Sequence, residues 1–177
     1  MIRLLKQFFL AIWEVLEVVL ISAATVVVIR TFLVQPFLVS GASMEPNFSD
    51  GNYLLIDEIT YKFREPQRGE VVVFRSPQDK STFFIKRIVA LPGEQVNIKN
   101  NQIYINGELL EEDYLASNVR TAGLVEALLK KSEYLVLGDN RYNSFDSRNW
   151  GSLSRDRIIG LARLRLFPFN DLQIFNY

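Results

Sequence analysis

Residues 82–91 read TFFIKRIVAL, a short run of aromatic and β-branched side chains around one lysine and one arginine. Such a composition favours a β-strand. Side chains alternate along a strand, so Lys86 shares a face with Phe84 and Ile88, whereas Arg87 points the other way. Apolar surroundings disfavour the ammonium cation and lower the pKa of a lysine from its ordinary value of about 10.4. The stretch therefore predicts a strand whose lysine is either a desolvated base or a solvated edge-strand lysine that blocks aggregation.

Runs of the same kind recur through the chain beyond residue 36. They include YLLIDEITYKF, GEVVVF, EQVNIKNNQIYINGELL, EYLVL and IIGLARLRLF. In the third run, the pairs Asn-Asn at 100–101 and Asn-Gly at 106–107 are typical of turns that tolerate a positive φ. Only LVEALLKK, residues 124–131, favours a helix in this part, and residues 111–133 as a whole are predicted to form a surface excursion. The pattern predicts a mainly β domain.

The amino-terminal segment has a different character. Residues 8–29 read FFLAIWEVLEVVLISAATVVVI and are interrupted only by Glu14 and Glu17. About 20 mostly apolar residues are long enough to cross a bilayer as a helix. The two acids lie one turn apart in the first half, so we expect them near an interface, where a charge costs less. A cleaved signal peptide, a buried helix of a soluble protein and an amphipathic helix lying on a membrane are the alternatives to this transmembrane helix.

The basic residues around this segment predict its orientation. Arg3 and Lys6 precede the apolar run, and after Arg30 no lysine or arginine occurs until Lys62. The positive-inside rule therefore favours a single-pass chain in the cell membrane, with a cytoplasmic N-terminus and the remaining residues outside.

The composition excludes several functional classes. The 20 Lys and Arg residues balance the 20 Asp and Glu residues, and the chain has no cysteine and no histidine. A balanced charge does not suggest binding to nucleic acid. Without histidine and cysteine there is no Ser-His-Asp triad and no thiolate or imidazole metal ligand. No EF-hand spacing or Gly-rich phosphate loop occurs. We expect no metal, no cofactor and no nucleic-acid partner.

A second stretch suggests covalent chemistry. Residues 40–48 read SGASMEPNF, which places Ser43 in a loop of small residues next to Met44, as expected for a nucleophile on a tight turn. Without histidine, the group that takes its proton must be a lysine or a carboxylate. A lysine acts as a base only when it is neutral, so it should lie within a hydrophobic strand, as Lys86 does.

Four blocks then occur in one order: SGASMEP, RGEVVVF, FIKRIVALPGE and GDNRYNSFDSR. Together with the apolar N-terminal segment and RTFLVQPF, they resemble the bacterial type I signal peptidases, the serine–lysine leader peptidases. The resemblance covers nearly the whole chain, to LRLFPF near its end. It implies a membrane-bound serine endopeptidase that removes signal peptides from secreted, translocated preproteins. The implied reaction proceeds through an acyl-enzyme, with the cut after a small-x-small pattern.

The resemblance implies roles by position. Ser43 would be the nucleophile and Lys86 the general base. Ser144 would donate to or accept from the lysine amine and orient it, while Asp146 and Arg148 would form an ion pair that braces the same loop. A lysine that acts as a base needs such a neutral partner, because a negatively charged partner would favour the protonated form of the lysine.

Four further positions follow from the resemblance. Gly138 and Asp139 would shape the turn that brings this loop to the site. Gly41 stands where some members carry a serine that helps to bind the oxyanion, so the Ser43 backbone N–H is the expected donor. Asn47 stands where threonine is usual, and we expect little effect from it.

An extended signal peptide would bind as an added strand, so that its side chains at positions −1 and −3 face the enzyme. Phe37, Val39 and Ile85 are near enough in sequence to the reacting pair to line small apolar pockets for them.

The resulting organisation is an anchor in residues 1–35 and a β-rich catalytic domain in residues 36–177, with a reduced inserted excursion in residues 99–133. Three exposed aromatic residues are expected to dip into the lipid bilayer: Trp150, Phe167 and Phe169.

Two other functions stay open at this point. One is a self-cleaving serine–lysine regulator, which would share the reacting pair but would want a DNA-binding N-terminus. The other is a non-enzymatic β module anchored to a membrane.

Overall fold

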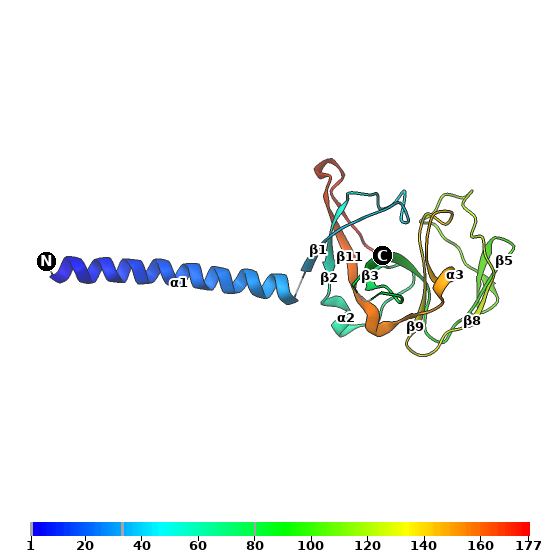
Figure 1. The fold of residues 1–177 in the computed structure, drawn as a ribbon, viewed down its shortest axis with the longest axis horizontal. Coiled ribbons are helices and arrows are strands. Elements are labelled where there is room, and N and C mark those ends of the chain that lie inside the picture. The colour runs from blue at the N-terminus through cyan, green and yellow to red at the C-terminus, as the bar shows by residue number, and fades with distance from the viewer. Residues whose placement is uncertain (1, 33, 80) are drawn as a thin grey trace.

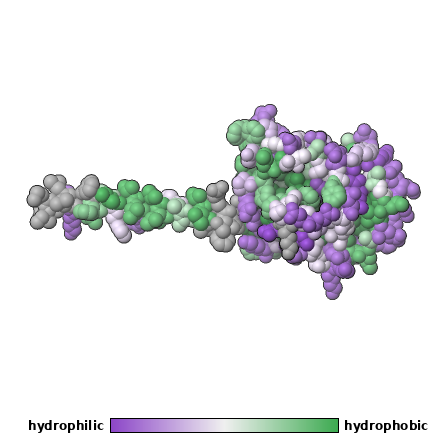
Figure 2. All heavy atoms as spheres, viewed as in Figure 1, coloured by the Kyte–Doolittle hydropathy of each residue, from purple (hydrophilic) through white to green (hydrophobic). Residues whose placement is uncertain are grey.

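A long helix projects from a β-rich domain in the computed structural model of the chain (Figure 1). The structure describes residues 2–32, 34–79 and 81–177. Helix α1 (Ile2–Phe32) has 31 residues, and at about 1.5 Å per residue it is roughly 46 Å long. Its segment Phe9–Val27 is apolar enough to cross a membrane, and none of it is buried against the domain. Figure 2 shows hydrophobic side chains along this helix, so a buried helix of a soluble protein does not fit.

Two antiparallel sheets build the domain, which confirms the predicted mainly β fold. The strands of the larger sheet are, in spatial order, β1 (Val34–Leu38), β2 (Tyr53–Asp57), β11 (Ile158–Phe167), β3 (Val71–Arg75), β4 (Phe83–Ala90), β9 (Glu133–Leu137) and β10 (Leu153–Ser154), with β12 (Gln173–Ile174) beside β11. The smaller sheet contains β7 (Glu108–Leu109), β6 (Gln102–Ile105), β5 (Gln95–Lys99) and β8 (Val125–Leu128). The short helices are α2 (Thr60–Phe63), α3 (Ser147–Trp150), η1 (Arg155–Arg157) and η2 (Phe169–Asp171).

Strand β4 is the strand predicted from TFFIKRIVAL. It pairs with β3 along most of its length, from Arg87 opposite Val71 to Phe83 opposite Arg75. On its other side, β9 begins to pair only at Arg87. The edge of Phe83–Lys86 therefore has no neighbouring strand among the described residues. Strand β1 is the first strand of the sheet and pairs with β2 alone in the part of the chain that the structure describes, so its outer edge is open as well.

The prediction of a helix at residues 124–131 is wrong. Residues Val125–Leu128 form strand β8, which pairs with β5 so that Val125 faces Ile98 and Ala127 faces Val96. The letters VEAL fit the two-residue period of a strand as well as a helical turn. Antiparallel pairing with the edge of β5 outweighs the helical propensity of Ala, Glu and Leu.

The turns predicted at the asparagine pairs are confirmed. Asn100, Asn101 and Asn106 all have positive φ, at 53°, 62° and 52°. They join β5 to β6 and β6 to β7, and they set the register of the smaller sheet.

One of three apolar clusters lies under the serine loop and holds it in place. Met44 and Phe48 are almost fully buried in this cluster, beside Val39. The other members come from β2, β3 and β11: Leu54, Ile56, Val71, Val73 and Ala162. The loop that carries Ser43 is therefore anchored by its own apolar side chains.

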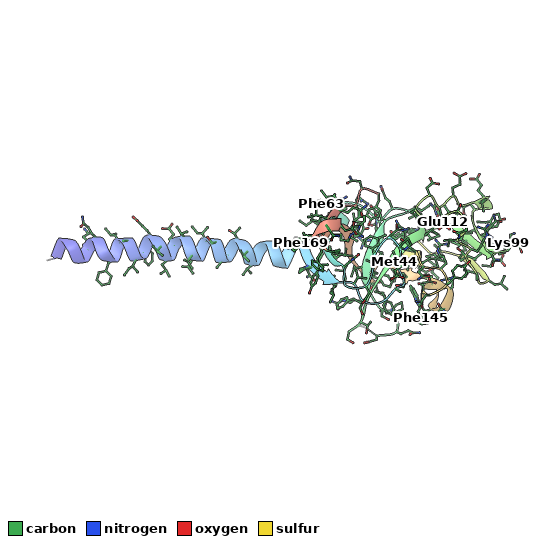
Figure 3. The ribbon with its side chains drawn as sticks, turned by 90° about the horizontal axis from the view of Figure 1, so that it is seen from above. Met44, Phe63, Lys99, Glu112, Phe145 and Phe169 are labelled. Atoms are coloured by element: carbon green, nitrogen blue, oxygen red, sulfur yellow. The ribbon has the colours of Figure 1, made fainter. Side chains whose placement is uncertain are left out.

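The expectation for the three exposed aromatic residues holds only in part. Phe167 and Phe169 are exposed and contact one another edge to face, with ring centroids 5.5 Å apart. Trp150 is instead partly buried against Phe74, at 5.9 Å between ring centroids, because α3 turns it toward the core. Phe63 is a further exposed aromatic that the sequence did not single out, and Figure 3 shows both Phe63 and Phe169 at the end of the domain next to α1.

Candidate active site

Ser43 lies in the loop between β1 and β2, at the centre of a well-held turn. The Phe48 amide donates to the carbonyl of Met44 at 2.9 Å, and the Val39 amide donates to that of Asn52 at 2.9 Å. Gly41 has φ of +91°, which favours glycine, and its N–H donates to Asp50 Oδ1 at 2.7 Å. Gly41 thus supports the loop, while the Ser43 N–H has no hydrogen-bond partner among the described residues.

The side chain of Lys86 reaches Ser43 directly. Its Nζ donates to Ser43 Oγ at 2.6 Å and to the Ile85 carbonyl at 2.9 Å, and it lies 5.6 Å from the centre of the Phe84 ring. Only 3% of the residue is exposed. Burial lowers the pKa of Lys86 from 10.5 to about 8, although the charges of Asp146 and Asp139 act in the opposite direction. The interpretation of Lys86 as a solvated edge-strand lysine is therefore wrong.

Both aspartates near Lys86 are paired with arginines, which limits their effect on the amine. Arg87 points away from Lys86, as the alternation of β4 predicts, and donates to both oxygens of Asp139 at 2.8 and 2.6 Å. Arg148 donates to both oxygens of Asp146 at 2.8 Å. The positive charge of each arginine partly cancels the field of its carboxylate at Lys86. The two aspartates therefore stabilise the protonated lysine less than unpaired carboxylates would.

The ion pair predicted between Asp146 and Arg148 is present in this geometry, and Asp146 also orders the loop around it. Its Oδ2 accepts from the Gly138 amide at 3.0 Å, and its side chain caps the short helix α3. Burial alone would raise the pKa of Asp146, but the hydrogen bonds from Arg148 and Gly138 outweigh it and hold that pKa below its ordinary value. Asp146 therefore stays ionised and paired beside the site.

The hydrogen bond expected between Ser144 and the lysine amine is not formed. Ser144 Oγ is buried and lies near Asp146, but it has no well-formed hydrogen bond among the described residues. Its position is nevertheless close to the reacting pair. A Cβ added to Gly138 would collide with Ser144 Oγ and with the Ser43 carbonyl oxygen. Ser144 and Ser43 thus both lie against the position that a side chain at residue 138 would take, so only glycine fits there.

Asn140 is a site residue that the sequence analysis missed. Its backbone N–H donates to the Ser43 carbonyl at 3.1 Å, and its Nδ2 donates to the Ala42 carbonyl at 3.0 Å. These two contacts join the loop after β9 to the backbone of the serine loop. The block GDNR contains Asn140, but nothing in its letters indicates that the partner is a backbone nearly a hundred residues away.

The side chain of Asn47 contacts two other segments of the domain. Its Nδ2 donates to Asp139 Oδ2 at 2.8 Å and to the Tyr114 carbonyl at 3.0 Å. The Arg87 guanidinium lies 4.1 Å above the Tyr114 ring. Asn47 therefore links the serine loop to two neighbouring segments.

Residues 111–123, called the strap here, lie against the loop that carries Ser144. Glu112 accepts from Arg141 Nη1 at 2.9 Å, and Arg141 Nε in turn donates to the Gly138 carbonyl at 3.0 Å. The Ala122 carbonyl accepts from Arg148 Nη1 at 3.2 Å. The expected surface excursion thus has an inner side that contacts the site.

A pocket of about 110 Å³ opens beside Ser43. Phe37, Val39 and Ile85 all line it, as the sequence predicts. It lies between the open edges of β1 and β4, and the rings of Phe37 and Phe83 meet across it at 5.5 Å between centroids. A small volume between two open strand edges suits a short side chain on an extended peptide.

The geometry supports nucleophilic chemistry without a metal ligand set. A serine hydroxyl contacts an amine whose pKa is lowered, so the amine can take the hydroxyl proton near neutral pH. Within residues 2–32, 34–79 and 81–177, His, Cys, Asp and Glu side chains form no group of three or more that could hold a metal ion.

Comparisons with known proteins identify the family of the chain. Residues 12–167 match the family profile described as "Signal peptidase, peptidase S26". The chain is 37% identical over 171 residues to signal peptidase I of Bacillus amyloliquefaciens, covering 91% of this chain and 88% of that one. It is 38% identical over 164 residues to probable signal peptidase I-2 of Synechocystis sp., covering 88% and 74%. A crystal structure of a signal peptidase I from Enterococcus faecalis is 32% identical, with a TM-score of 0.48 over 55% of this chain and 97% of that one. The chain therefore belongs to the signal peptidases of family S26, which are serine peptidases.

Proposed function

We propose that Ser43 and Lys86 are the nucleophile and the general base of a signal peptidase that removes signal peptides from translocated preproteins. The observation that carries the proposal is the 2.6 Å contact between Ser43 Oγ and the Lys86 amine, whose pKa is lowered to about 8 by burial. An amine whose pKa is near neutral pH can accept the proton of the serine hydroxyl, and an isolated serine has no such acceptor.

The reaction proceeds in two halves. Neutral Lys86 takes the proton of Ser43 as Oγ bonds to the carbonyl carbon of the small residue at −1, and the unpaired Ser43 N–H stabilises the oxyanion. The C–N bond then breaks, and the Lys86 ammonium returns the proton to the leaving amine. In the second half Lys86 takes a proton from a water, whose oxygen bonds to the acyl carbon. The bond from that carbon to Ser43 Oγ then breaks, and Lys86 returns the proton to Oγ.

The two open strand edges explain the choice of substrate. A signal peptide in extended conformation would lie between β1 and β4 and pair with their free edges. Its side chains at −1 and −3 would then point to the same side, into the pocket lined by Phe37, Val39 and Ile85. The size of that pocket favours small residues at both positions.

The proposal includes the position of the enzyme at a membrane. Helix α1 would cross the bilayer with its N-terminus in the cytoplasm, as Arg3 and Lys6 favour, and residues 36–177 would form the catalytic domain outside. Exposed Phe63 and Phe169 lie at the end of the domain next to α1, where they would meet the interface (Figure 3). The active site is thereby held close to the surface where signal peptides end.

The test is cleavage of a signal-peptide substrate by the purified full-length protein. Ser43→Ala and Lys86→Met should each abolish cleavage at an unchanged fold, because no histidine exists to replace the lysine. If Lys86→Met kept more than about a tenth of the activity, the lysine would not be the general base. Processing of the chain itself, with no cleavage of a separate signal peptide, would point to a self-cleaving regulator instead.

A further inference from the structure

A second hollow lies beside the active site and has no part in the chemistry described above. It has a volume of about 290 Å³, and we call it the downstream pocket. Its walls are Glu45 and Pro46 from the serine loop, Leu115, Ala116 and Val119 from the strap, and the loop around Tyr142. It shares no lining residue with the pocket between β1 and β4.

Both pockets border the serine loop, at different residues of it. The first takes Ser40 and Ser43 from this loop and lies against β1 and β4, whereas the second takes Glu45 and Pro46, which follow the serine. Asn140, which donates to the carbonyls of Ala42 and Ser43, also lines the downstream pocket. A peptide that fills the first pocket with its residues before the cut must leave past the other side of Ser43.

The alternation of an extended chain selects the substrate residue that faces this pocket. The side chains at −3, −1 and +2 are each two residues apart, so they point to the same side of the strand, while +1 points away. When −3 and −1 face the enzyme, +2 does so as well.

The charges around the downstream pocket define what suits it. Asp139 and Arg141 also line it, but Asp139 is paired with Arg87 and Arg141 with Glu112. Glu45 is in no ion pair among the described residues. The pocket therefore has apolar walls and a single uncompensated negative charge.

We propose that the downstream pocket binds the side chain of the second residue of the mature protein, favouring an apolar side chain and disfavouring an acidic one. The inference rests on the proposed function, because it needs a peptide cut at Ser43. It adds a specificity determinant after the cut, carried mainly by the strap.

The experiment compares four peptide substrates that differ only at +2, with Gly, Leu, Gln or Glu, using the full-length enzyme. Wild type should cleave the Leu peptide with a kcat/KM roughly ten-fold above that of the Gly peptide, as expected for a side chain entering an apolar pocket. Ala116→Trp fills the pocket and should remove this preference, leaving the Gly peptide within about two-fold of wild type. Ser117→Trp is the matched control, because it adds the same bulk at an exposed neighbouring position that does not line the pocket, and it should keep the preference.

The charge is tested by the Gln and Glu peptides, which have nearly the same shape. Wild type should cleave the Gln peptide about five-fold faster, and Glu45→Gln should bring the two rates together. A signal-peptide ester that ends at −1 has no +2 residue, so Ala116→Trp and wild type should hydrolyse it equally. Equal rates for all four peptides in wild type, or a Leu preference that survives Ala116→Trp, would overturn the pocket while leaving the proposed function intact. If none of the peptides is cleaved, the proposed function fails and this inference with it.

Discussion

Replacing Lys86 by methionine should stabilise the fold at neutral pH, even though it removes the catalytic base. Burial lowers the pKa of Lys86 from 10.5 to about 8 in the folded protein. Below about pH 8 the folded protein therefore contains a buried ammonium cation, which lowers the free energy of unfolding by about 3 kcal/mol. Between pH 8 and 10.5 the unfolded chain binds a proton that the folded chain does not, so the stability of the wild type rises with pH. Above pH 10.5 the cost is gone.

Methionine has a similar length, and its thioether carries no charge at any pH. The substitution also removes the hydrogen bonds from Nζ to Ser43 and to the Ile85 carbonyl, each contributing about 1 kcal/mol. The loss of these hydrogen bonds lowers the stability of the variant by a similar amount at low and at high pH. The stability of Lys86→Met relative to wild type should therefore be about 3 kcal/mol more favourable at pH 7 than at pH 11.

Urea unfolding in detergent, followed by the fluorescence of Trp150 beside Phe74, measures this difference. All other titrating groups are common to both proteins and cancel. Ser43→Ala is the control, because it removes the same 2.6 Å contact without removing the amine, and it should show no such pH dependence. A stability difference between Lys86→Met and wild type that is the same at both pH values would refute the lowered pKa.

Further predictions concern rate, packing and topology. The acidic limb of the rate–pH profile should lie near pH 8, because catalysis needs the neutral form of Lys86; a limb near pH 4 would indicate a carboxylate base. Ser144→Asp should move the acidic limb to higher pH and lower kcat at neutral pH, because a carboxylate beside the reacting pair favours the protonated amine; a limb that stays near pH 8 contradicts this. Gly138→Ala should abolish turnover by pushing Ser144 and Ser43 apart, measured against an unfolding curve, and near-normal activity would show that the loop can yield. Protease added to intact spheroplasts should digest the domain after residue 36, and its protection until lysis would reverse the orientation.

The parts of the site that depend on one strand could be predicted from the sequence. The alternation of β4 places Lys86 and Arg87 on opposite faces, and the apolar neighbours of Lys86 account for its burial. The apolar helix and the turns at Asn100 and Asn106 follow from equally local signals. In each case the physical cause lies within a few residues of the feature.

The parts that join distant segments could not be predicted. Asn140 binds the backbone of the serine loop, and the Tyr114 ring stacks on Arg87 of β4, because segments far apart in the sequence meet in space. The amine of Lys86 takes the Ile85 carbonyl as its second partner in place of Ser144, which depends on side-chain placement. The prediction of a helix at residues 124–131 is wrong for a similar reason. This sequence is compatible with both a helix and a strand, and pairing with the neighbouring strand β5 favours the strand.

The free edges of β1 and β4 also bear on when the enzyme can act. An unpaired edge usually invites another chain to aggregate on it. Here the two edges border one small pocket beside Ser43, and the rings of Phe37 and Phe83 meet across it, which leaves no space for a folded segment. A polypeptide can enter only where it is extended and has released its own backbone hydrogen bonds. Cleavage must therefore come before the residues next to the cut fold, and an early-folding passenger needs a flexible stretch at its start to be released.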